Sequence, residues 1–381
     1  MWGKLKYVGL LYLCFKSCVD TFMSLCVLQH EKGSCDMLDH LVEQNNLKPA
    51  MKKYGLIPEK DIRFIKEMIA GPLQESKEQE WPYKGRKEEK SFLYEIVSNK
   101  RNGVDVDKFD YLARDSSYLG IKNNFDFHRF LQFARVCKVD GRKTICTRDK
   151  EEDNMYDLFY TRHRLHKRAY QHRVNKVIEH MIAEAFVKAD GHIEIEGSEG
   201  SAGSEGTIGS KGSRGLFTLS TAFKNMEAYT KLTDNVFEEI LNSSRPELQE
   251  AKKILQDIVS RKIYKFVGER KPKDPIEDWK VINMDYGMKD ENPVEHMHFY
   301  SKYEPDVAKT MSTENASRIR TTIFSEQLIK VFCKKIDEQS VEAAKKHFEQ
   351  WMKTKPNLVG PEVNLSDPPA VDTKEITKQH E

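Results

Sequence analysis

The sequence lacks an excess of either charge, because 62 Lys and Arg residues stand against 60 Asp and Glu residues in a chain of 381. Bulk charge therefore cannot drive binding to a polyanion, and any such affinity has to come from local clusters of basic side chains. Cysteine is also scarce: the seven residues are irregularly spaced and form no C-x-x-C pair. This spacing fits neither a disulfide framework nor a zinc module and suits a reducing compartment, so we expect an intracellular protein.

Long apolar runs are lacking as well. One run, from Tyr7 to Phe15, follows Lys4 and Lys6 in the manner of a secretory signal, but Lys16 and Asp20 interrupt it. The run is too short to span a bilayer, and no small-x-small cleavage motif follows it. We therefore expect neither a membrane span nor a working signal peptide in this segment.

Apolar residues recur at helical spacing over most of the remaining chain, which predicts a mostly α-helical protein. The length predicts about two domains, and a hydrophobic content of 39% is enough for an ordinary core. A hairpin is expected in 135–148, turned at Asp140-Gly141. Helices are expected near residues 37–41, 62–69, 92–97, 106–115, 152–189, 220–268 and 341–352, and strands near 279–284, 296–300 and 327–333.

Two segments do not follow the patterns of a folded core. In 197–215 glycine stands at every third position and proline is absent, which favours a flexible low-complexity loop over a collagen-like helix. The segment 353–381 carries four prolines and is expected to be a disordered tail.

The stretch 106–115 places chemistry on one face of a predicted helix, and Asp105 is positioned to cap that helix. Residues four apart share a face, and here they are two carboxylates and a phenol: Asp107, Tyr111 and Asp115. A solvated surface helix is the alternative, because Asp110 and Arg114 form an ordinary i,i+4 charge pair.

About fifty residues later, the predicted helix 152–189 begins with a dense basic half. Residues four apart on one face there are Arg162, His166 and Tyr170, and the flanking residues include Arg164, Lys167, Arg168, His172 and Arg173. Like charges repel on an isolated helix, so such a cluster is usually balanced by acidic neighbours or by an anionic ligand. Arginine offers a bidentate fork for phosphate oxygens, which makes a phosphate-rich ligand one interpretation and a solvated cationic face the other.

Five motifs together resemble one family. They are His30-Glu-x-Gly-Ser, Tyr54-Gly-Leu-Ile-Pro, Phe92-Leu-Tyr-Glu-Ile-Val-Ser-Asn-Lys-Arg-Asn-Gly, Val106-Asp-Lys-Phe-Asp-Tyr-Leu-Ala-Arg-Asp and Arg168-Ala-Tyr-Gln-His. From about residue 29 to 352 the chain is similar to the vertebrate sterile-alpha-motif and HD-domain deoxynucleoside triphosphate triphosphohydrolases. The resemblance implies the C-terminal part of an HD-domain helical fold with a smaller α+β C-terminal lobe.

The same resemblance implies domain limits and an activity. A partial HD-type domain would cover 29–196 and the C-terminal lobe 216–352, with an unmatched segment at 1–28. The implied reaction converts a dNTP and water to a deoxynucleoside and triphosphate, in dGTPase-type control of the dNTP pool and antiviral defence. Family members form nucleotide-bridged tetramers and lie mainly in the nucleus.

The resemblance also implies roles for single residues. In the substrate site, Asp107 would be a catalytic metal ligand and His30 would assist near the α-phosphate; the residues around the nucleotide would be Lys108, Tyr111, Asp115, Arg162, His166, Tyr170 and Gln171. Lys108 and Arg162 would hold phosphates, and Asp115 would accept the 3′-hydroxyl. Activating dNTP or GTP would contact Asp126, Arg129, Arg148, Lys150, Asn154, His172, Arg173, Arg261, Lys265 and Lys302.

This chain departs from the family pattern at the metal. The family holds its divalent ion (Mg, Mn, Fe or Zn) with a His, an adjacent His-Asp pair and a distal Asp, yet no His-Asp dipeptide occurs here and only Asp107 matches. One carboxylate cannot hold such an ion tightly, so we expect a truncated member whose catalysis is impaired. Two alternatives stay open. A ligand set could be rebuilt from His30, Glu31, Asp36, Asp39 and His40; or the chain is a non-catalytic subunit that binds nucleotides or single-stranded nucleic acid and joins family tetramers.

Overall fold

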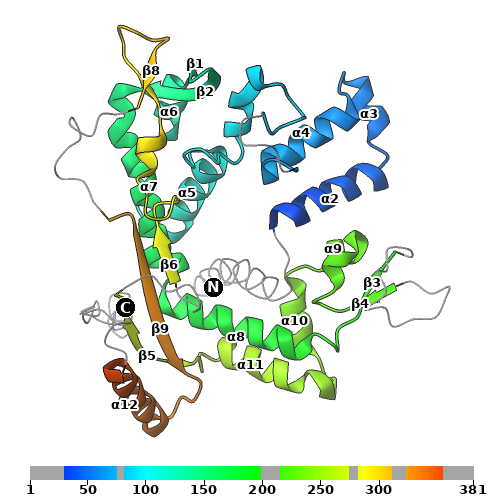
Figure 1. The fold of residues 1–381 in the computed structure, drawn as a ribbon. Coiled ribbons are helices and arrows are strands. Elements are labelled where there is room, and N and C mark those ends of the chain that lie inside the picture. Colours follow the sequence, from blue (N-terminus) through cyan, green and yellow to red (C-terminus); the bar gives the residue numbers. More distant parts are fainter. Residues whose placement is uncertain (1–29, 75–80, 199–214, 274–281, 311–322, 355–381) are drawn as a thin grey trace, which may run out of the picture. The chain divides into compact units, whose positions relative to one another are not determined.

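The computed structural model describes residues 30–74, 81–198, 215–273, 282–310 and 323–354, and Figure 1 draws its ribbon. The chain divides into two compact units. Among the described residues, the first comprises those up to 263 together with those in 284–325, and the second comprises those in 264–283 together with those in 326–354. Helices predominate and the sheets are small, which confirms the expected mostly α-helical fold with a smaller sheet-containing part.

Helices make up most of the first unit. The α-helices are α2 (His30–Gln44), α3 (Lys48–Lys53), α4 (Pro58–Ala70), α5 (Val106–Leu119), α6 (Phe127–Phe133), α7 (Glu152–Leu165), α8 (Arg173–Ala189), α9 (Met226–Lys231), α10 (Asn235–Asn242) and α11 (Gln249–Val259). A π-turn, His166–Tyr170, separates α7 from α8. Short 3-10 helices cover Glu88–Glu95, Asp149–Glu151, Ala222–Lys224, Pro246–Leu248 and Pro293–His296.

Two small sheets belong to the first unit. In the larger one, β1 (Arg135–Val139), β2 (Arg142–Arg148), β7 (Phe299–Tyr300) and β8 (Ala308–Lys309) lie in that order. β1 and β2 are antiparallel, and their turn at Asp140-Gly141 has positive φ at both residues, which confirms the expected hairpin. β7 runs parallel to β2, with Tyr300 beside Arg148. The other sheet is the antiparallel pair of β3 (Ile195–Gly197) and β4 (Gly215–Phe217).

The remaining strands, β5 (Lys265–Arg270), β9 (Ser325–Cys333) and β6 (Ile282–Asp285), form a three-stranded sheet in the order β5-β9-β6. Within the second unit α12 (Glu338–Thr354) packs on β5. Gly268 permits this contact, because a Cβ at that position would lie only 2.6 Å from the Phe348 ring.

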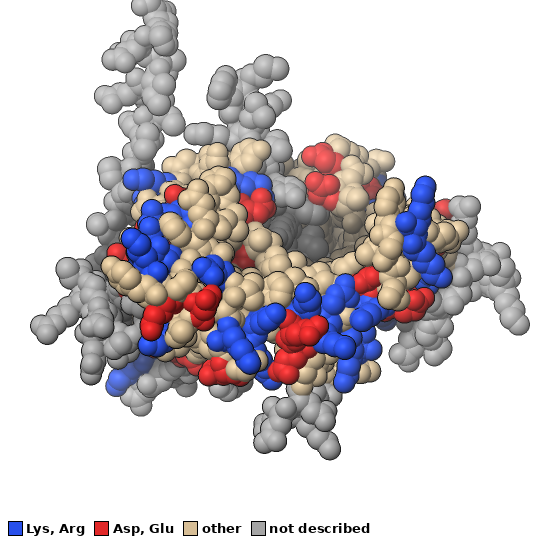
Figure 2. Space-filling view, turned by 90° about the horizontal axis from the view of Figure 1, so that it is seen from above, with Lys and Arg blue, Asp and Glu red and all other residues tan. Residues whose placement is uncertain are grey.

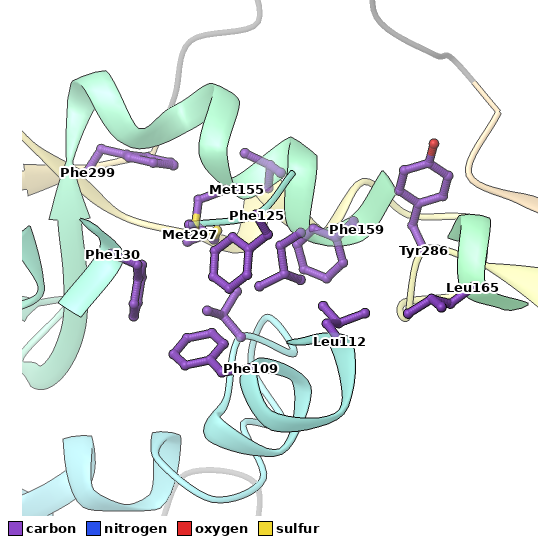
Figure 3. Packing of buried hydrophobic residues seen from close by; sticks show 13 residues of the cluster. Phe109, Leu112, Phe125, Phe130, Met155, Phe159, Leu165, Tyr286, Met297 and Phe299 are labelled. Carbon is purple, nitrogen blue, oxygen red and sulfur yellow. The ribbon is translucent and has the colours of Figure 1, made fainter. Parts of the chain in front are cut away.

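The main hydrophobic cluster of the first unit fills the space between α5 and α7 (Figure 3). Its members with no exposed surface are Leu112, Met155, Leu158, Phe159 and Leu165. The Phe109 ring lies 5.2 Å from the Phe125 ring and 5.3 Å from the Phe130 ring, which brings α6 into the same core. The apolar side predicted for 106–115 is thus the side that α5 buries.

Some of the sequence-based element predictions are wrong in part. The helical segment 220–268 ends at Val259, because Arg261 takes a positive φ of 61° and β5 begins at Lys265. The helix expected at 92–97 is a 3-10 helix that ends at Glu95. Most of the strand expected at 296–300 is a proline-started 3-10 turn and an irregular link, and only two residues pair as β7.

Several predictions concern segments outside the described residues. They are the N-terminal segment up to residue 29, most of the glycine-every-third segment (199–214), part of the expected strand (279–281), and the tail from 355. Within the part of the chain that the structure does describe, no helix combines the length and the apolar character that a membrane crossing requires. On the face shown in Figure 2, basic and acidic side chains are interspersed, so no field of one sign covers it.

Replacing Leu112 with alanine tests the α5–α7 core. Leu112 has 0% exposed surface, so Leu112→Ala should leave a cavity and lower the free energy of unfolding by about 2–5 kcal/mol. Tyr118→Ala on the same helix is the matched control, because Tyr118 is 86% exposed and its loss should change stability by about 0.5 kcal/mol or less. Urea unfolding measures both; equal effects of the two substitutions would contradict this core.

Candidate functional site

The N-terminus of α5 holds a lysine beside a carboxylate. The Asp105 Oδ1 atom accepts the Lys108 backbone N–H at 3.2 Å, which confirms the expected cap, and Oδ2 accepts the Asn99 N–H at 3.0 Å. The Lys108 ammonium lies 3.3 Å from both oxygens of Asp105. Asp107, on the same turn, is exposed. Lys108 is therefore oriented by the cap, whereas Asp107 faces solvent.

The loop before α5 is fixed by amide side chains. The Asn99 Nδ2 group donates to the Asn102 side chain at 2.8 Å and to the Val104 carbonyl at 3.1 Å, and Asn102 accepts the Val104 N–H at 3.0 Å. Gly103 has a φ of 70°, and a Cβ there would lie 3.8 Å from the Lys108 side chain. The Asn-Gly pair thus gives this loop the turn geometry that presents Asp105.

The helix predicted for 152–189 is interrupted, so that prediction is wrong at its centre. The Gln171 N–H donates to the His166 carbonyl at 2.7 Å, five residues back, as in a π-helix. The Ala169 carbonyl accepts the Asn175 side-chain amide at 2.6 Å and the His172 N–H at 3.1 Å. Hydrophobic periodicity does not reveal such an insertion, and π-bulges occur frequently at functional sites.

The π-turn and α5 meet through a tyrosine and a carboxylate. Tyr170 donates its phenol hydrogen to Asp115 at 2.6 Å, and the Arg114 guanidinium lies 3.3 Å from the same carboxylate. The His166 ring meets the Tyr170 ring edge-on, with centroids 5.0 Å apart at 84°. Burial, and then the Asp115 carboxylate, raise the pKa of Tyr170, so its hydroxyl stays a hydrogen-bond donor at neutral pH.

A second tyrosine of the site, Tyr111 of α5, lies close to Arg162 of α7. Burial raises the pKa of Tyr111 to about 12, the positive charge of Arg162 opposes this rise, and Asp107 adds to it. Arg162 Nη1 in turn donates to the carboxylate of Asp285 at 3.1 Å and to the main-chain oxygen of the same residue. Tyr111 is therefore a protonated phenol within electrostatic reach of both Arg162 and Asp107.

The structure thus brings most of the expected substrate-site residues together. Contacts from α5, α7 and the π-turn join Tyr111, Asp115, Arg162, His166 and Tyr170, which we call the α5–α7 cluster. Lys108 and Asp107 lie on the first turn of the same α5, and Gln171 follows the π-turn. His30 is the exposed first residue of α2, whose main packing partners are α4 and α9 rather than α5 or α7.

Some of the expected activator residues form a second group around α6. Asp126 caps α6 by accepting the Arg129 N–H at 2.9 Å. Asn154 makes two hydrogen bonds to the Asp126 backbone, each 2.9 Å long, which ties α6 to the first turn of α7. The fully buried Glu151 pairs with Arg129 at 2.6 Å. This buried carboxylate fixes the orientation of the arginine.

Cations surround an aromatic ring in this second group. Lys150 lies 4.1 Å from the centroid of Phe133, Arg129 lies 5.4 Å from it, and Arg148 lies 5.8 Å from it. We call these four residues the Phe133 cluster. Lys302 is two residues beyond Tyr300, the strand partner of Arg148.

The other expected activator residues lie elsewhere. His172 caps α8, because its Nδ1 accepts the Val174 N–H at 3.3 Å, and Arg173 is the first residue of that helix. Arg261 follows the end of α11 and Lys265 begins β5, so the two do not share the helix expected for 220–268.

The described residues do not fit a divalent-metal site. Nowhere in 30–74, 81–198, 215–273, 282–310 or 323–354 do three or more His, Cys, Asp or Glu side chains gather in a way that could hold an ion. Two carboxylates of α2 that were candidates for a rebuilt site form ion pairs with lysines instead, Asp36 with Lys32 and Asp39 with Lys66. Of the implied ligand set, the described residues include Asp107, on the first turn of α5.

Sequence reasoning missed two residues that shape the cluster. Asp285 is 123 positions away from Arg162, and only the Asp-x-Gly turn signal marked its neighbourhood. Asn175 lies on the mostly buried face of α8, where no local pattern distinguishes it from core residues.

Comparisons with known proteins identify relatives. The deoxynucleoside triphosphate triphosphohydrolase SAMHD1 of Danio rerio is 49% identical over 374 residues, which cover 88% of this chain and 58% of the relative. The protein of the same name from Homo sapiens is 49% identical over 354 residues, 84% of this chain and 54% of the relative. A SAMHD1 homologue of Dictyostelium discoideum is 30% identical over 385 residues, 95% of this chain and 65% of the relative. The chain thus spans little more than half the length of the vertebrate relatives, and no protein-family model matches it.

The half-buried histidine of the cluster, His166, predicts a pH effect on stability. Burial, and then the charge of Arg162, lower the pKa of His166 from 6.5 to about 3. The unfolded chain therefore takes up a proton near pH 6.5 that the folded chain binds only near pH 3. The stability that neutral His166 contributes is fully present above pH 6.5 and is lost as the pH falls toward 3, by at most about 1.4 kcal/mol per pH unit.

Urea unfolding at pH 6.5 and at pH 5 measures this loss. His166→Asn should make the decline between the two values shallower, because it removes the group that titrates. His192→Asn, at an exposed position, is the control and should leave the decline unchanged. An unchanged slope in His166→Asn would contradict the assignment.

Proposed function

We propose, on the premise that the chain is homologous to the SAMHD1 deoxynucleoside triphosphate triphosphohydrolases, that it binds a deoxynucleoside triphosphate at the α5–α7 cluster. The observation that supports this proposal is that an arginine, two tyrosine rings and a carboxylate come together from α5, α7 and the π-turn. An arginine is a side chain that commonly binds phosphate. An anionic head, a flat base and a sugar hydroxyl require these three kinds of group.

Each group has a role that its chemistry suits. Arg162 and Lys108 would bind phosphate oxygens, since both are cations held by acidic partners rather than free in solvent. Asp115 accepts one hydrogen bond from Tyr170, and a carboxylate has about four acceptor positions, so it retains capacity for a 3′-hydroxyl. Tyr111 and Tyr170 would pack on the sugar and base. His166 is neutral and would lie beside the nucleotide without adding charge.

The reaction proposed from the homology is hydrolysis of the dNTP to a deoxynucleoside and triphosphate. We propose that this 381-residue chain performs it poorly, because the residues that the structure describes would bind and orient a nucleotide but do not form the divalent-metal site on which such hydrolysis depends. Activation by dNTP or GTP, assembly into tetramers, a nuclear location and a part in antiviral defence are further proposals from the same homology.

Arg162→Gln tests the nucleotide site. Loss of a charged phosphate contact costs about 1.5–3 kcal/mol, so dGTP affinity should fall by about ten-fold or more while deoxyguanosine affinity changes little. Arg164→Gln is the matched control, because Arg164 lies on the same helix but stacks on the exposed Tyr160 ring at 5.7 Å. Calorimetric titration measures both ligands. Equal losses in the two variants would contradict the site.

Turnover provides a separate test. The purified chain should release negligible triphosphate from dGTP with Mg²⁺ or Mn²⁺, measured by chromatography of the products over many hours. Robust metal-dependent turnover that Asp107→Ala abolishes would overturn the proposed impairment and would require a further set of metal ligands.

A second candidate function rests on the Phe133 cluster. Three cations around one aromatic ring suit either an activating nucleotide or a stacked base of a single strand. Salt dependence distinguishes the two ligands. The logarithm of the binding constant for a single strand falls with the logarithm of the salt concentration, with a slope of about 0.7 per phosphate contact. A single nucleotide instead should show a preference for one sugar.

A further inference from the structure

Arg162 is held by a residue far away in the sequence. Its Nη1 atom donates to the Asp285 carboxylate at 3.1 Å and to the main-chain oxygen of Asp285. Both side chains are mostly buried, with 17% of Arg162 and 25% of Asp285 exposed. A partly buried, charge-assisted pair of this kind restricts the arginine to one orientation.

The turn that follows Asp285 fixes the carboxylate in its place. The Gly287 N–H donates to Asp285 Oδ1 at 2.7 Å, so the same oxygen that meets Arg162 is bound by its own backbone. Gly287 has a φ of 103°, which a residue with a side chain rarely adopts. A Cβ there would also lie 3.7 Å from Arg162 Nε. Glycine therefore provides the conformation of the turn, while a Cβ there would make ordinary contact with the guanidinium.

Tyr286, which lies between Asp285 and Gly287, packs the turn against α7. The Tyr286 N–H donates to the Phe324 carbonyl at 3.0 Å, and the Tyr286 ring stacks on His163, the neighbour of Arg162, with centroids 5.5 Å apart at 21°. Tyr286 is buried in the main hydrophobic cluster, where Figure 3 shows it near Leu165. The turn is thus packed against the same part of α7 that carries the arginine.

We infer that the turn Asp285–Gly287 is a positioning element for phosphate binding: it holds Arg162 Nη1 so that the rest of the guanidinium fork is oriented toward a triphosphate before the ligand arrives. This inference rests on the proposed function, because it assigns Arg162 to the phosphates. A guanidinium has five donors, and Asp285 occupies those of one nitrogen. Ordering a long side chain in advance removes an entropic cost from ligand binding.

Asp285→Asn tests the inference, because asparagine keeps the shape and an oxygen for Gly287 but loses the charge that holds Arg162. We expect dGTP affinity to fall about ten-fold while the affinity for deoxyguanosine, titrated into the millimolar range, stays the same. Asp290→Asn is the matched control, since Asp290 lies in the same loop, accepts a hydrogen bond from Ser325 and is assigned no part in the site. It should change neither affinity.

A double-mutant cycle separates positioning from a general structural role. In the Arg162→Gln background, Asp285→Asn should cause no further loss of dGTP affinity, because the side chain it positions is already gone. Gly287→Ala is a second variant in case Asp285→Asn does not fold, and it should show the same loss for dGTP and the same indifference to deoxyguanosine.

The outcomes distinguish the two levels of the proposal. If the unaltered chain binds dGTP and Asp285→Asn binds it equally or more tightly, the turn does not position Arg162 and the inference fails alone. Equal losses for dGTP and deoxyguanosine, or losses that add in the cycle, would show a structural role and would also overturn it. If the unaltered chain does not bind dGTP, the proposed function fails and the inference fails with it.

Discussion

The packing of α5 against α7 is the contact on which the candidate site depends. Leu112 and Phe159 are fully buried between the two helices, and the Phe109 ring extends that core to α6. Because each helix is amphipathic, burying its apolar side fixes the rotation of its polar side. The hydrogen bond from Tyr170 to Asp115 and the proximity of Arg162 to Tyr111 then follow from the way the apolar sides of α5 and α7 pack.

Local chemistry predicted the parts of this arrangement that depend on neighbouring residues. Asp105 caps α5, and Asp140-Gly141 turns the hairpin, because a cap and a two-residue turn are decided within a few positions. The π-turn could not be predicted, since one inserted residue leaves the apolar pattern on both sides intact. The pairing of Arg162 with Asp285 spans 123 positions, and no periodicity records such a distance. The roles that the resemblance gives to single residues stay predictions.

The sequence has nearly equal numbers of basic and acidic residues, and three cations of the candidate sites are paired with carboxylates. Lys108 faces Asp105, Arg162 faces Asp285, and Arg129 faces Glu151, so each of these cations already has an anionic partner. A phosphate must therefore share the cation with a carboxylate rather than meet a bare charge. Sharing is easier for arginine, which has five donors, than for lysine, which has three. Holding a cation in one orientation before a ligand arrives lowers the entropic cost of binding.

The two clusters are joined by one helix. Asn154, on the first turn of α7, ties down the cap of α6 next to the Phe133 cluster, and Arg162 lies eight residues further along α7, roughly 12 Å by helical rise. The residues between them include the fully buried Leu158 and Phe159, so this part of α7 cannot bend without opening the core. The hydrogen bonds that tie Asn154 to the α6 cap and the pair of Arg162 with Asp285 are therefore held at a fixed spacing by one packed helix.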